Sequence, residues 1–166
     1  FDDNNFDGQF RILDLASLVN LYGVSPYYFS EDNVYEFQSW QGRILIDGSG
    51  IDTITAENYL SHVYLDLRTN THSYIGKKDE LITKAYQLSV GDSIIENAIG
   101  GKGNDWIIGN NVNNILEGRF GNDVLYGGEG QDKIIGGKGD DTIDLSELNF
   151  VQDQVIFEDE ISSNGK

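Results

Sequence analysis

Residues 100–144 read GGKGNDWII, GNNVNNILE, GRFGNDVLY, GGEGQDKII and GGKGDDTID. Written in nines, this stretch holds five consecutive copies of the pattern G-G-x-G-x-D-x-U-x, in which U is apolar. The second copy is the least faithful, because it lacks the second and fourth glycines and has asparagine at position six. A flexible linker has no reason to repeat an apolar residue in five registers, so we interpret the stretch as a structural repeat.

The residue types of the repeat predict a calcium site. Glycine at positions one, two and four lets the backbone adopt φ > 0 and turn its carbonyl oxygens toward a common point. Position six supplies a hard side-chain oxygen, and calcium takes six to eight oxygen ligands. The candidate ligands at position six are Asp105, Asn114, Asp123, Asp132 and Asp141, and the candidate backbone ligands are Gly100, Gly103, Gly118, Gly121, Gly127 and Gly130.

The last three residues of each copy predict a short strand with one inward-facing side chain. The inward residues are Ile107, Leu116, Leu125, Ile134 and Ile143. Each copy then forms half a turn of a flattened coil, a parallel β-roll, and copies two apart stack on the same side. We expect ions between stacked turns, shared by Asp105 with Asp123, Asn114 with Asp132, and Asp123 with Asp141. The middle pair is the weakest, because Asn114 is neutral.

Composition agrees with a metal-stabilised extracellular module. The 166 residues carry a formal charge of −17, which repels itself in a compact state unless cations neutralise it. This acidity disfavours a nucleic acid partner. The chain has no cysteine and thus no disulfide bonds, so bound metal is expected to stabilise the fold instead. No apolar run long enough to insert in a membrane appears, and the start at Phe1 suggests an excised fragment.

The amino terminus offers a second calcium candidate. Residues 3–14 match a twelve-residue EF-hand loop, with Asp in place of the final Glu. Its candidate ligands are Asp3, Asn5, Asp7, Gln9 and Asp14. Apolar residues at helical spacing predict one short helix over 12–22, and loop plus helix is similar to half of a dockerin repeat. An acidic turn that caps the helix without an ion is the alternative.

Two shorter acidic groups precede the repeats. Asp47 and Asp52 flank a glycine-rich turn and are candidate ligands of a further ion, with Glu57 as a third; a plain hairpin is equally compatible. Glu96 and Asn97 stand directly before the first repeat. The alternation at residues 63–67 predicts a half-buried strand.

The repeats resemble RTX repeats, which occur in large calcium-dependent proteins exported by type I secretion. Residues 12–23, 37–40, 47–54, 63–67 and 95–101 resemble, in the same order, the part of serralysin-type zinc peptidases that follows their protease domain. The resemblance implies that 34–99 is a β-rich lead-in stacked on the β-roll of 100–144, after the loop and helix of 1–33. It also implies that Glu96 and Asn97 close the first coil and its calcium site. Residues 145–166 are expected to supply capping strands and a tail.

Two functions remain open at this stage. The chain lacks the H-E-x-x-H pattern of zinc peptidases, and His62 and His72 are expected to be surface or packing residues, so we expect no catalysis. One hypothesis is a ligand-binding module of a large bacterial adhesin, with a cell-surface peptide or glycan as partner. It is motivated by aromatic residues at 22, 27, 28, 29, 35, 37 and 40, although a core role suits most of them. The alternative is the carboxyl-terminal secretion and folding domain of a serralysin-type metalloprotease. Both imply a secreted or cell-surface protein of a Gram-negative bacterium that folds on binding calcium.

Overall fold

The computed structural model describes residues 29–37, 43–45, 47–69, 71–76, 87–90, 93–146 and 152–157. In these ranges the chain forms thirteen strands and no helix, which confirms the all-β prediction. The expected helix at 12–22 and the acidic loop at Asp3 lie outside the described residues. Within the described part, no helix has the length and apolarity to cross a membrane.

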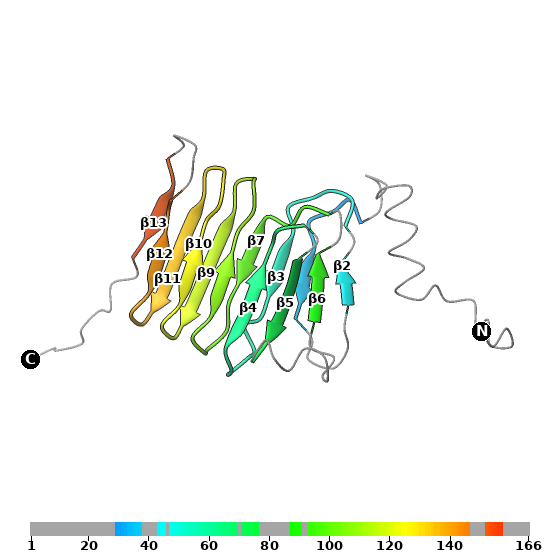
Figure 1. Cartoon of the computed structure of the whole chain (residues 1–166). Helices are drawn as coiled ribbons and strands as arrows, with labels where there is room; N and C mark the ends of the chain where they lie inside the picture. Colours follow the sequence, from blue (N-terminus) through cyan, green and yellow to red (C-terminus); the bar gives the residue numbers. More distant parts are fainter. Residues whose placement is uncertain are drawn as a thin grey trace, which may run out of the picture.

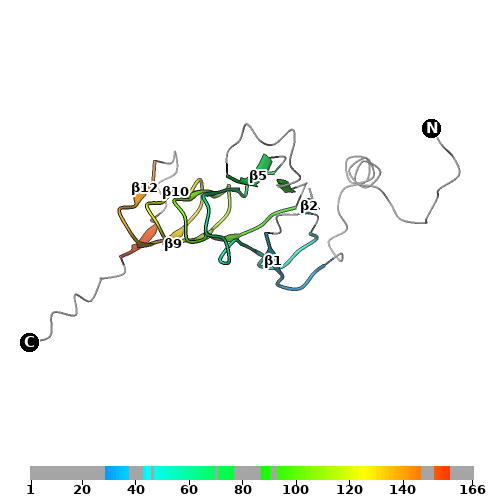
Figure 2. The same cartoon turned by 90° about the horizontal axis from the view of Figure 1, so that it is seen from below.

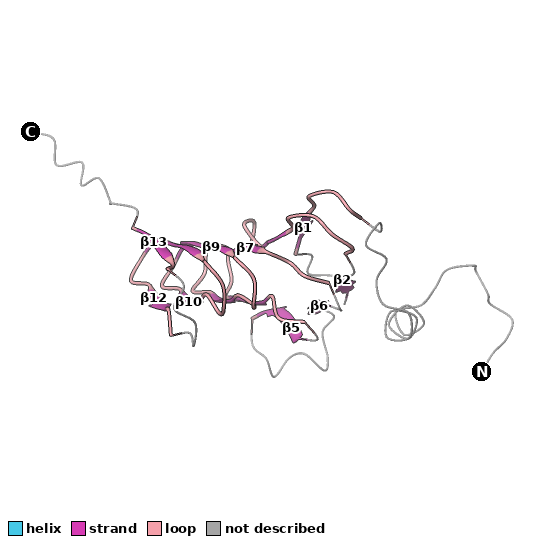
Figure 3. Cartoon of the chain, turned by 90° about the horizontal axis from the view of Figure 1, so that it is seen from above, coloured by secondary structure: helices cyan, strands magenta, loops and turns pink. Residues whose placement is uncertain are grey.

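The strands form two sheets. Sheet A has the order β1 (Val34–Glu36), β3 (Thr53–Thr55), β7 (Asn97–Ile99), β9 (Ile115–Phe120), β11 (Lys133–Lys138) and β13 (Gln154–Ile156). Sheet B has the order β12 (Thr142–Asp144), β10 (Val124–Tyr126), β8 (Trp106–Ile108), β4 (Val63–Asp66), β5 (Thr71–Ile75), β6 (Gln87–Val90) and β2 (Arg43–Leu45). The two sheets lie as two layers, with turns joining them at both sides (Figures 1 and 3).

The repeats wind between the two layers as a parallel coil. The chain runs from β7 to β8, back to β9, on to β10 and then to β11, so that it changes sheet at every turn. In sheet B, Leu125 pairs in parallel register with Ile107 and with Ile143. Two nonapeptides therefore make one full coil, and copies two apart stack. This confirms the β-roll, whose successive coils lie side by side in Figure 2.

The lead-in continues the same coil before the first repeat. Strand β3 pairs in parallel with β7, and β4 pairs in parallel with β8, so that β3 and β4 occupy the coil that precedes the repeats. After β4 the regular winding is interrupted, because β5 pairs antiparallel with both β4 and β6. The chain then returns to sheet A at β7. Both sheets thus contain strands of the lead-in and of the repeats, as the predicted β-roll on a β-rich lead-in requires.

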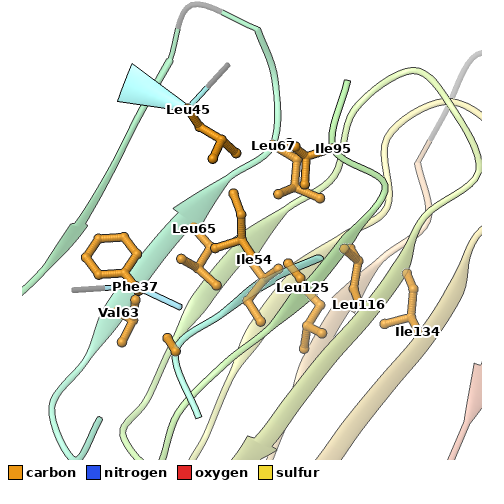
Figure 4. Close-up of a cluster of buried hydrophobic side chains, with 13 residues drawn as sticks. Phe37, Leu45, Ile54, Val63, Leu65, Leu67, Ile95, Leu116, Leu125 and Ile134 are labelled. Carbon is orange, nitrogen blue, oxygen red and sulfur yellow. The ribbon is translucent and has the colours of Figure 1, made fainter. Parts of the chain in front are cut away.

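Aliphatic side chains fill the space between the sheets (Figure 4). The inward residues of the first four repeats are fully buried: Ile107, Leu116, Leu125 and Ile134 are each 0% exposed. In the lead-in the same core contains Ile54, Val63, Leu65, Leu67, Ile95 and Ala98. Burying one such Leu or Ile stabilises the fold by roughly 1.5–3 kcal/mol. Ile143, in the last coil of the repeats, is half-buried.

Candidate calcium-binding site

The turns between the sheets form two stacked rows. The first row leads from sheet A to sheet B and comprises residues 56–62, 100–105, 118–123 and 136–141. The second row leads from sheet B to sheet A and comprises residues 47–52, 93–96, 109–114 and 127–132. Each turn ends at the residue before a strand, which in the repeats is position six. The predicted side-chain ligands therefore stand one above another at the two sides of the coil.

In the first row, these carboxylates are linked by hydrogen bonds along the stack. Asp105 donates its backbone N–H to Asp123 Oδ1 at 2.7 Å, and Asp123 donates its own N–H to Asp141 Oδ1 at 2.9 Å. At the lower end, Asp105 Oδ1 accepts the N–H of Val63 at 2.8 Å. Each carboxylate thus accepts a hydrogen bond from the preceding turn with one oxygen, and its second oxygen faces its own turn.

The second row has the same ladder and extends beyond the repeats. Asp132 Oδ1 accepts the N–H of Asn114 at 2.8 Å, and Asp153 Oδ1 accepts the N–H of Asp132 at 2.9 Å. In the lead-in, Asp52 Oδ1 accepts the N–H of residue 33, and Asp52 donates its N–H to Glu96 Oε2, both at 2.8 Å. Sequence reasoning missed Asp153. The available signal was the Asp-x-apolar order of residues 153–155, which stands twenty-one residues after Asp132 instead of eighteen.

A further ladder uses position five, which sequence reasoning did not consider. Asn104 Oδ1 accepts the N–H of Asn122 at 2.9 Å, and Asn122 Oδ1 accepts the N–H of Asp140 at 3.1 Å. In the second row, Asn113 Oδ1 accepts the N–H of Gln131 at 2.8 Å. The signal was present, because position five is Asn, Gln or Asp in all five repeats. These bonds fix the spacing of the turns between which the ions are expected.

Burial makes the ionised carboxylates of the ladder costly without a cation. Asp105 and Asp123 are at most 1% exposed. Burial, with lesser repulsion from Asp105 and Asp141, raises the pKa of Asp123 to about 7. Burial, with lesser repulsion from Asp47 and Glu96, raises the pKa of Asp52 to about 6, and burial also raises the pKa of Asp105. A bound cation would remove this penalty, because a buried charge is stable when it is paired.

The atoms around Asp123 fit calcium. Its Oδ2 is buried and has no hydrogen-bond donor. A Cβ placed on Gly118 would collide with this oxygen and with the carbonyl oxygen of Gly136. A Cβ on Gly139 would likewise collide with the carbonyl oxygen of Gly121. Oxygens of neighbouring turns therefore crowd together in the first row, and oxygen is the ligand atom that calcium takes.

The shell of such an ion needs backbone oxygens as well as carboxylates. Across the described residues, no group of three or more His, Cys, Asp or Glu side chains is arranged to hold a metal. Glycine at positive φ allows backbone carbonyl oxygens to supply the further ligands. Positive φ occurs at positions two and four of the last three repeats: Arg119 (78°), Gly121 (116°), Gly128 (97°), Gly130 (117°), Gly137 (100°) and Gly139 (138°).

The other predicted glycines serve close packing. A Cβ on Gly103 would lie 2.6 Å from the backbone nitrogen of His62, in the preceding turn. At position one, a Cβ on Gly100 would lie 2.8 Å from Asp105 Oδ2, and one on Gly127 would collide with Asp132 Oδ2. The expectation that positions one, two and four adopt φ > 0 is therefore met at positions two and four in three of the five copies and at position one in none. In the first copy, the close approach of the turn 56–62 is the reason for glycine.

The acidic groups of the lead-in come together in the second row. Asp47 is 3% exposed and accepts hydrogen bonds from the hydroxyl of Tyr35 and from the N–H of Ser49. It lies close enough to Asp52 to raise the pKa of that carboxyl, and Asp52 Oδ2 is buried without a donor. Asp47, Asp52 and Glu96, which the sequence suggested as two separate groups, thus form one cluster.

Asn97 and Glu57 lie apart from the cluster of Asp47, Asp52 and Glu96. Asn97 Oδ1 accepts the N–H of Ile115 at 3.1 Å, so its oxygen supports sheet A. Glu57 lies in the first row instead, where its carboxylate is ion-paired with Arg119 at 2.7 Å. The grouping of Glu57 with Asp47 and Asp52 is therefore wrong.

The outer face of sheet B carries a row of aromatic side chains. The rings of Tyr64 and Tyr74 stack at 4.7 Å with an interplanar angle of 9°, and Trp106 stacks on Tyr64 at 6.4 Å. Trp106 is 49% exposed. Phe37 belongs to the core, as the structural alternative for the amino-terminal aromatics predicted, and the residues at 22, 27, 28 and 40 lie outside the described residues.

Both histidines are at least partly exposed. His62 is half-buried and contacts the carbonyl oxygen of Asn104, and His72 is exposed. This matches the surface and packing roles that the sequence predicted.

Comparison with known proteins agrees with this geometry. A family model described as the RTX calcium-binding nonapeptide repeat (4 copies) matches residues 90–111 and 108–143. Serralysin G of Dickeya chrysanthemi and Metallopeptidase AprA of Pseudomonas marginalis are each 34% identical over 111 residues, and Serralysin of Proteus mirabilis is 33% identical over 111 residues. Each match covers 58% of this chain and 22% of the relative, so the chain spans about a fifth of the length of these relatives.

The matched region is the repeat-containing part of these relatives, and no catalytic family matches the chain. The stacked position-six carboxylates, the left-handed glycines and the family match agree on one assignment. Residues 90–143 therefore match the RTX calcium-binding nonapeptide repeat, in a chain that is similar to the repeat-containing part of serralysin-type proteins.

Proposed function

We propose that this chain is a calcium-dependent folding and ligand-binding module of a large extracellular adhesin. RTX repeats and the likeness to serralysins indicate a type I-secreted extracellular protein. The observation that carries the calcium part is the buried Asp123, whose second oxygen has no protein donor and lies beside Gly118, as does the carbonyl oxygen of Gly136. Without calcium, this charge and its neighbours oppose folding; with calcium, the same atoms become ligands. Folding and calcium binding are then one transition.

Far-UV circular dichroism tests this coupling. The intact chain is placed in chelator and titrated with calcium, with magnesium as the control ion. We expect β structure to increase cooperatively with calcium and not with magnesium, because magnesium demands a small octahedral shell and keeps its waters. Identical spectra in chelator and in calcium would show that the ions are not needed for folding.

The ligand-binding part rests on the aromatic row of sheet B. Trp106 is half exposed, and a hollow of about 410 Å³ lies on the neighbouring turns, lined among others by Arg68, Tyr126 and Glu129. The guanidinium of Arg68 is held in place by the buried Asp66 at 2.7 Å. Aromatic faces beside fixed polar groups suit a peptide or glycan, because the rings contact apolar parts and the polar groups orient the ligand.

A screen of the calcium-loaded chain against peptides and glycans tests this role. Trp106→Ala should abolish binding of any hit, whereas Phe157→Ala is the matched control, because Phe157 is 82% exposed at the far end of the coil. Binding that survives Trp106→Ala would refute the assignment of the aromatic row.

The likeness to serralysins favours a second candidate. In it, the chain is the secretion and folding domain of a zinc peptidase and binds nothing but calcium. Under this alternative the circular dichroism result is the same and the screen gives no hit. An export assay distinguishes the two further: removal of the repeats should block the export of an attached catalytic domain.

A further inference from the structure

We infer that side-chain amides take the place of a calcium ion where the lead-in meets the repeats, between the turns 93–96 and 109–114. The inference rests on the proposed calcium-dependent folding and restricts it: this junction holds without calcium. It concerns Asn110 and Asn114, which occupy positions two and six of the second repeat.

The hydrogen-bond ladder reverses its direction at Asn114. In the repeats on either side, the position-six side chain accepts an N–H from the preceding turn, as Asp123 does from Asp105. Asn114 instead donates its amide Nδ2 to the carbonyl oxygen of Glu96 at 2.8 Å. Its Oδ1 accepts the N–H of Asn110, also at 2.8 Å. Because a backbone N–H can only donate, this bond fixes which end of the amide faces Glu96.

Asn110 extends the bridge to two segments of the lead-in. Its Nδ2 donates to the carbonyl oxygen of Ile95 at 2.8 Å and to that of Leu67 at 3.3 Å. Its Oδ1 accepts the N–H of Val112 at 3.1 Å and the amide of Asn114 at 3.1 Å. Both orientations are again set by backbone groups of fixed polarity. The two amides therefore form a connected network across the junction.

Such a network is incompatible with a calcium ion at the same place. The carbonyl oxygens of Ile95 and Glu96 are bonded to NH₂ groups, and an NH₂ group offers calcium no ligand atom. The backbone of this turn also differs, because Asn110 and Val112 replace the two glycines and neither has a positive φ. Asn114 is 1% exposed, so its bonds are shielded from water. The second repeat departs from the consensus at the positions where the bridge forms.

The consequence is a division of the coil into two parts. Strand β7 and residues 115–117 of β9, which pair with it, flank the amide bridge and should stay folded on the lead-in when calcium is removed. Strands β11 and β12 depend on turns such as 118–123, in which a buried carboxylate oxygen lacks a donor. The junction would then present a preformed edge on which the calcium-dependent coils fold.

Hydrogen exchange of the intact chain, with and without chelator, tests this division. In chelator we expect amides of β7 and β9 to stay protected while those of β11 and β12 exchange. Asn114→Asp should accelerate exchange at β7 and β9 about ten- to hundredfold in chelator, because it replaces a donor with a charge that faces a carbonyl oxygen. Calcium should restore protection, with one more ion per chain by native mass spectrometry. Asn111→Asp makes the same charge change on an exposed neighbour. It should neither accelerate exchange at β7 and β9 in chelator nor add a bound ion in calcium.

Two results would overturn the inference. One is that β7 and β9 of the unaltered chain lose protection in chelator together with β11. The other is that Asn114→Asp leaves exchange in chelator unchanged. If Asn114→Asp does not fold even with calcium, Asn110→Ala takes its place, since it removes two donors without adding charge. In the Asn110→Ala variant, the amides of β7 and β9 must lose more protection in chelator than in calcium. Equal losses under the two conditions would contradict the inference. Failure of β11 and β12 to respond to calcium would instead refute the proposed function.

Discussion

Asp123→Asn separates the two roles of the buried carboxylate. The amide keeps an oxygen that can accept the N–H of Asp105, but it carries no charge at any pH. Without calcium, the charge of Asp123 lowers the stability of the folded chain, because the side chain is 1% exposed and lies near Asp105 and Asp141. With calcium, the same charge is a ligand. We therefore expect this substitution to stabilise the calcium-free fold and to destabilise the calcium-bound fold.

The size of the first effect follows from the pKa. Burial raises the pKa of Asp123 to about 7, whereas an aspartate in an unfolded chain has a pKa of about 3.9. The folded, calcium-free chain thus binds this proton more tightly, so its stability is greatest below about pH 4 and falls as pH rises to about 7. One pKa unit corresponds to about 1.4 kcal/mol, so at pH 8 the ionised side chain destabilises the calcium-free fold by about 4 kcal/mol.

Two measurements at pH 8 separate the effects, because the coil around Asp123 is expected to be unfolded without calcium. In chelator, Asp123→Asn should increase the β structure seen by circular dichroism, since it removes up to about 4 kcal/mol of destabilisation. In saturating calcium, it should lower the free energy of unfolding in urea and remove bound ions. Asp144→Asn is the control, because Asp144 is exposed at the end of β12 and Asn can still accept the N–H of Ser146. An Asp123→Asn variant that has less β structure than the unaltered chain in chelator at pH 8 would refute the reasoning.

Four further outcomes are expected. The calcium midpoint of folding should not rise between pH 8 and pH 6, because protonation of Asp123 stabilises only the folded chain while the unfolded aspartate stays ionised at both pH values; a midpoint that rises in circular dichroism titrations would contradict this. Asp123→Ala should raise that midpoint more than Asp132→Ala, since Asp123 has carboxylates in both adjacent turns, and equal midpoints would refute ion sharing. Arg119→Gly should be more stable than Arg119→Ala by about 1 kcal/mol in urea unfolding, because both lose the ion pair but only Ala keeps the strain of φ 78°. Gly118→Ala should abolish calcium-induced folding of the outer coils through collision with oxygens, whereas Gly76→Ala, in open space at φ 78°, should lower stability by about 1 kcal/mol and leave that folding intact.

The regular part of the chain was predictable from its nine-residue period. Glycines, a position-six carboxylate and an apolar residue recur in fixed order, and a coil of constant length converts that order directly into stacked positions. Ile107, Leu125 and Ile143 are in register because each coil has eighteen residues. The all-β class, the inward residues and the pairing of Asp105 with Asp123 all follow from this one regularity.

Where the number of residues in a coil changes, the nine-residue period no longer predicts which residues of neighbouring turns are aligned. Asp52 and Glu96 lie forty-four residues apart, because the antiparallel strands β5 and β6 are inserted between their coils. Asp153 continues the second row after twenty-one residues instead of eighteen. In both cases the sequence shows an acidic residue before a strand, but packing of that strand on the sheet decides which turn it faces.

The coil, its inward side chains and the oxygen-rich character of its turns could be predicted, because these depend on residue type and local period. The three-dimensional fold was needed to establish which acidic groups share a turn, which of them lack a donor and which way each amide points. The grouping of Asp47 with Glu96 and the bridge from Asn110 to Leu67 join residues far apart in the chain. Such contacts arise when distant segments stack, and burial then sets the cost of every oxygen that has no partner.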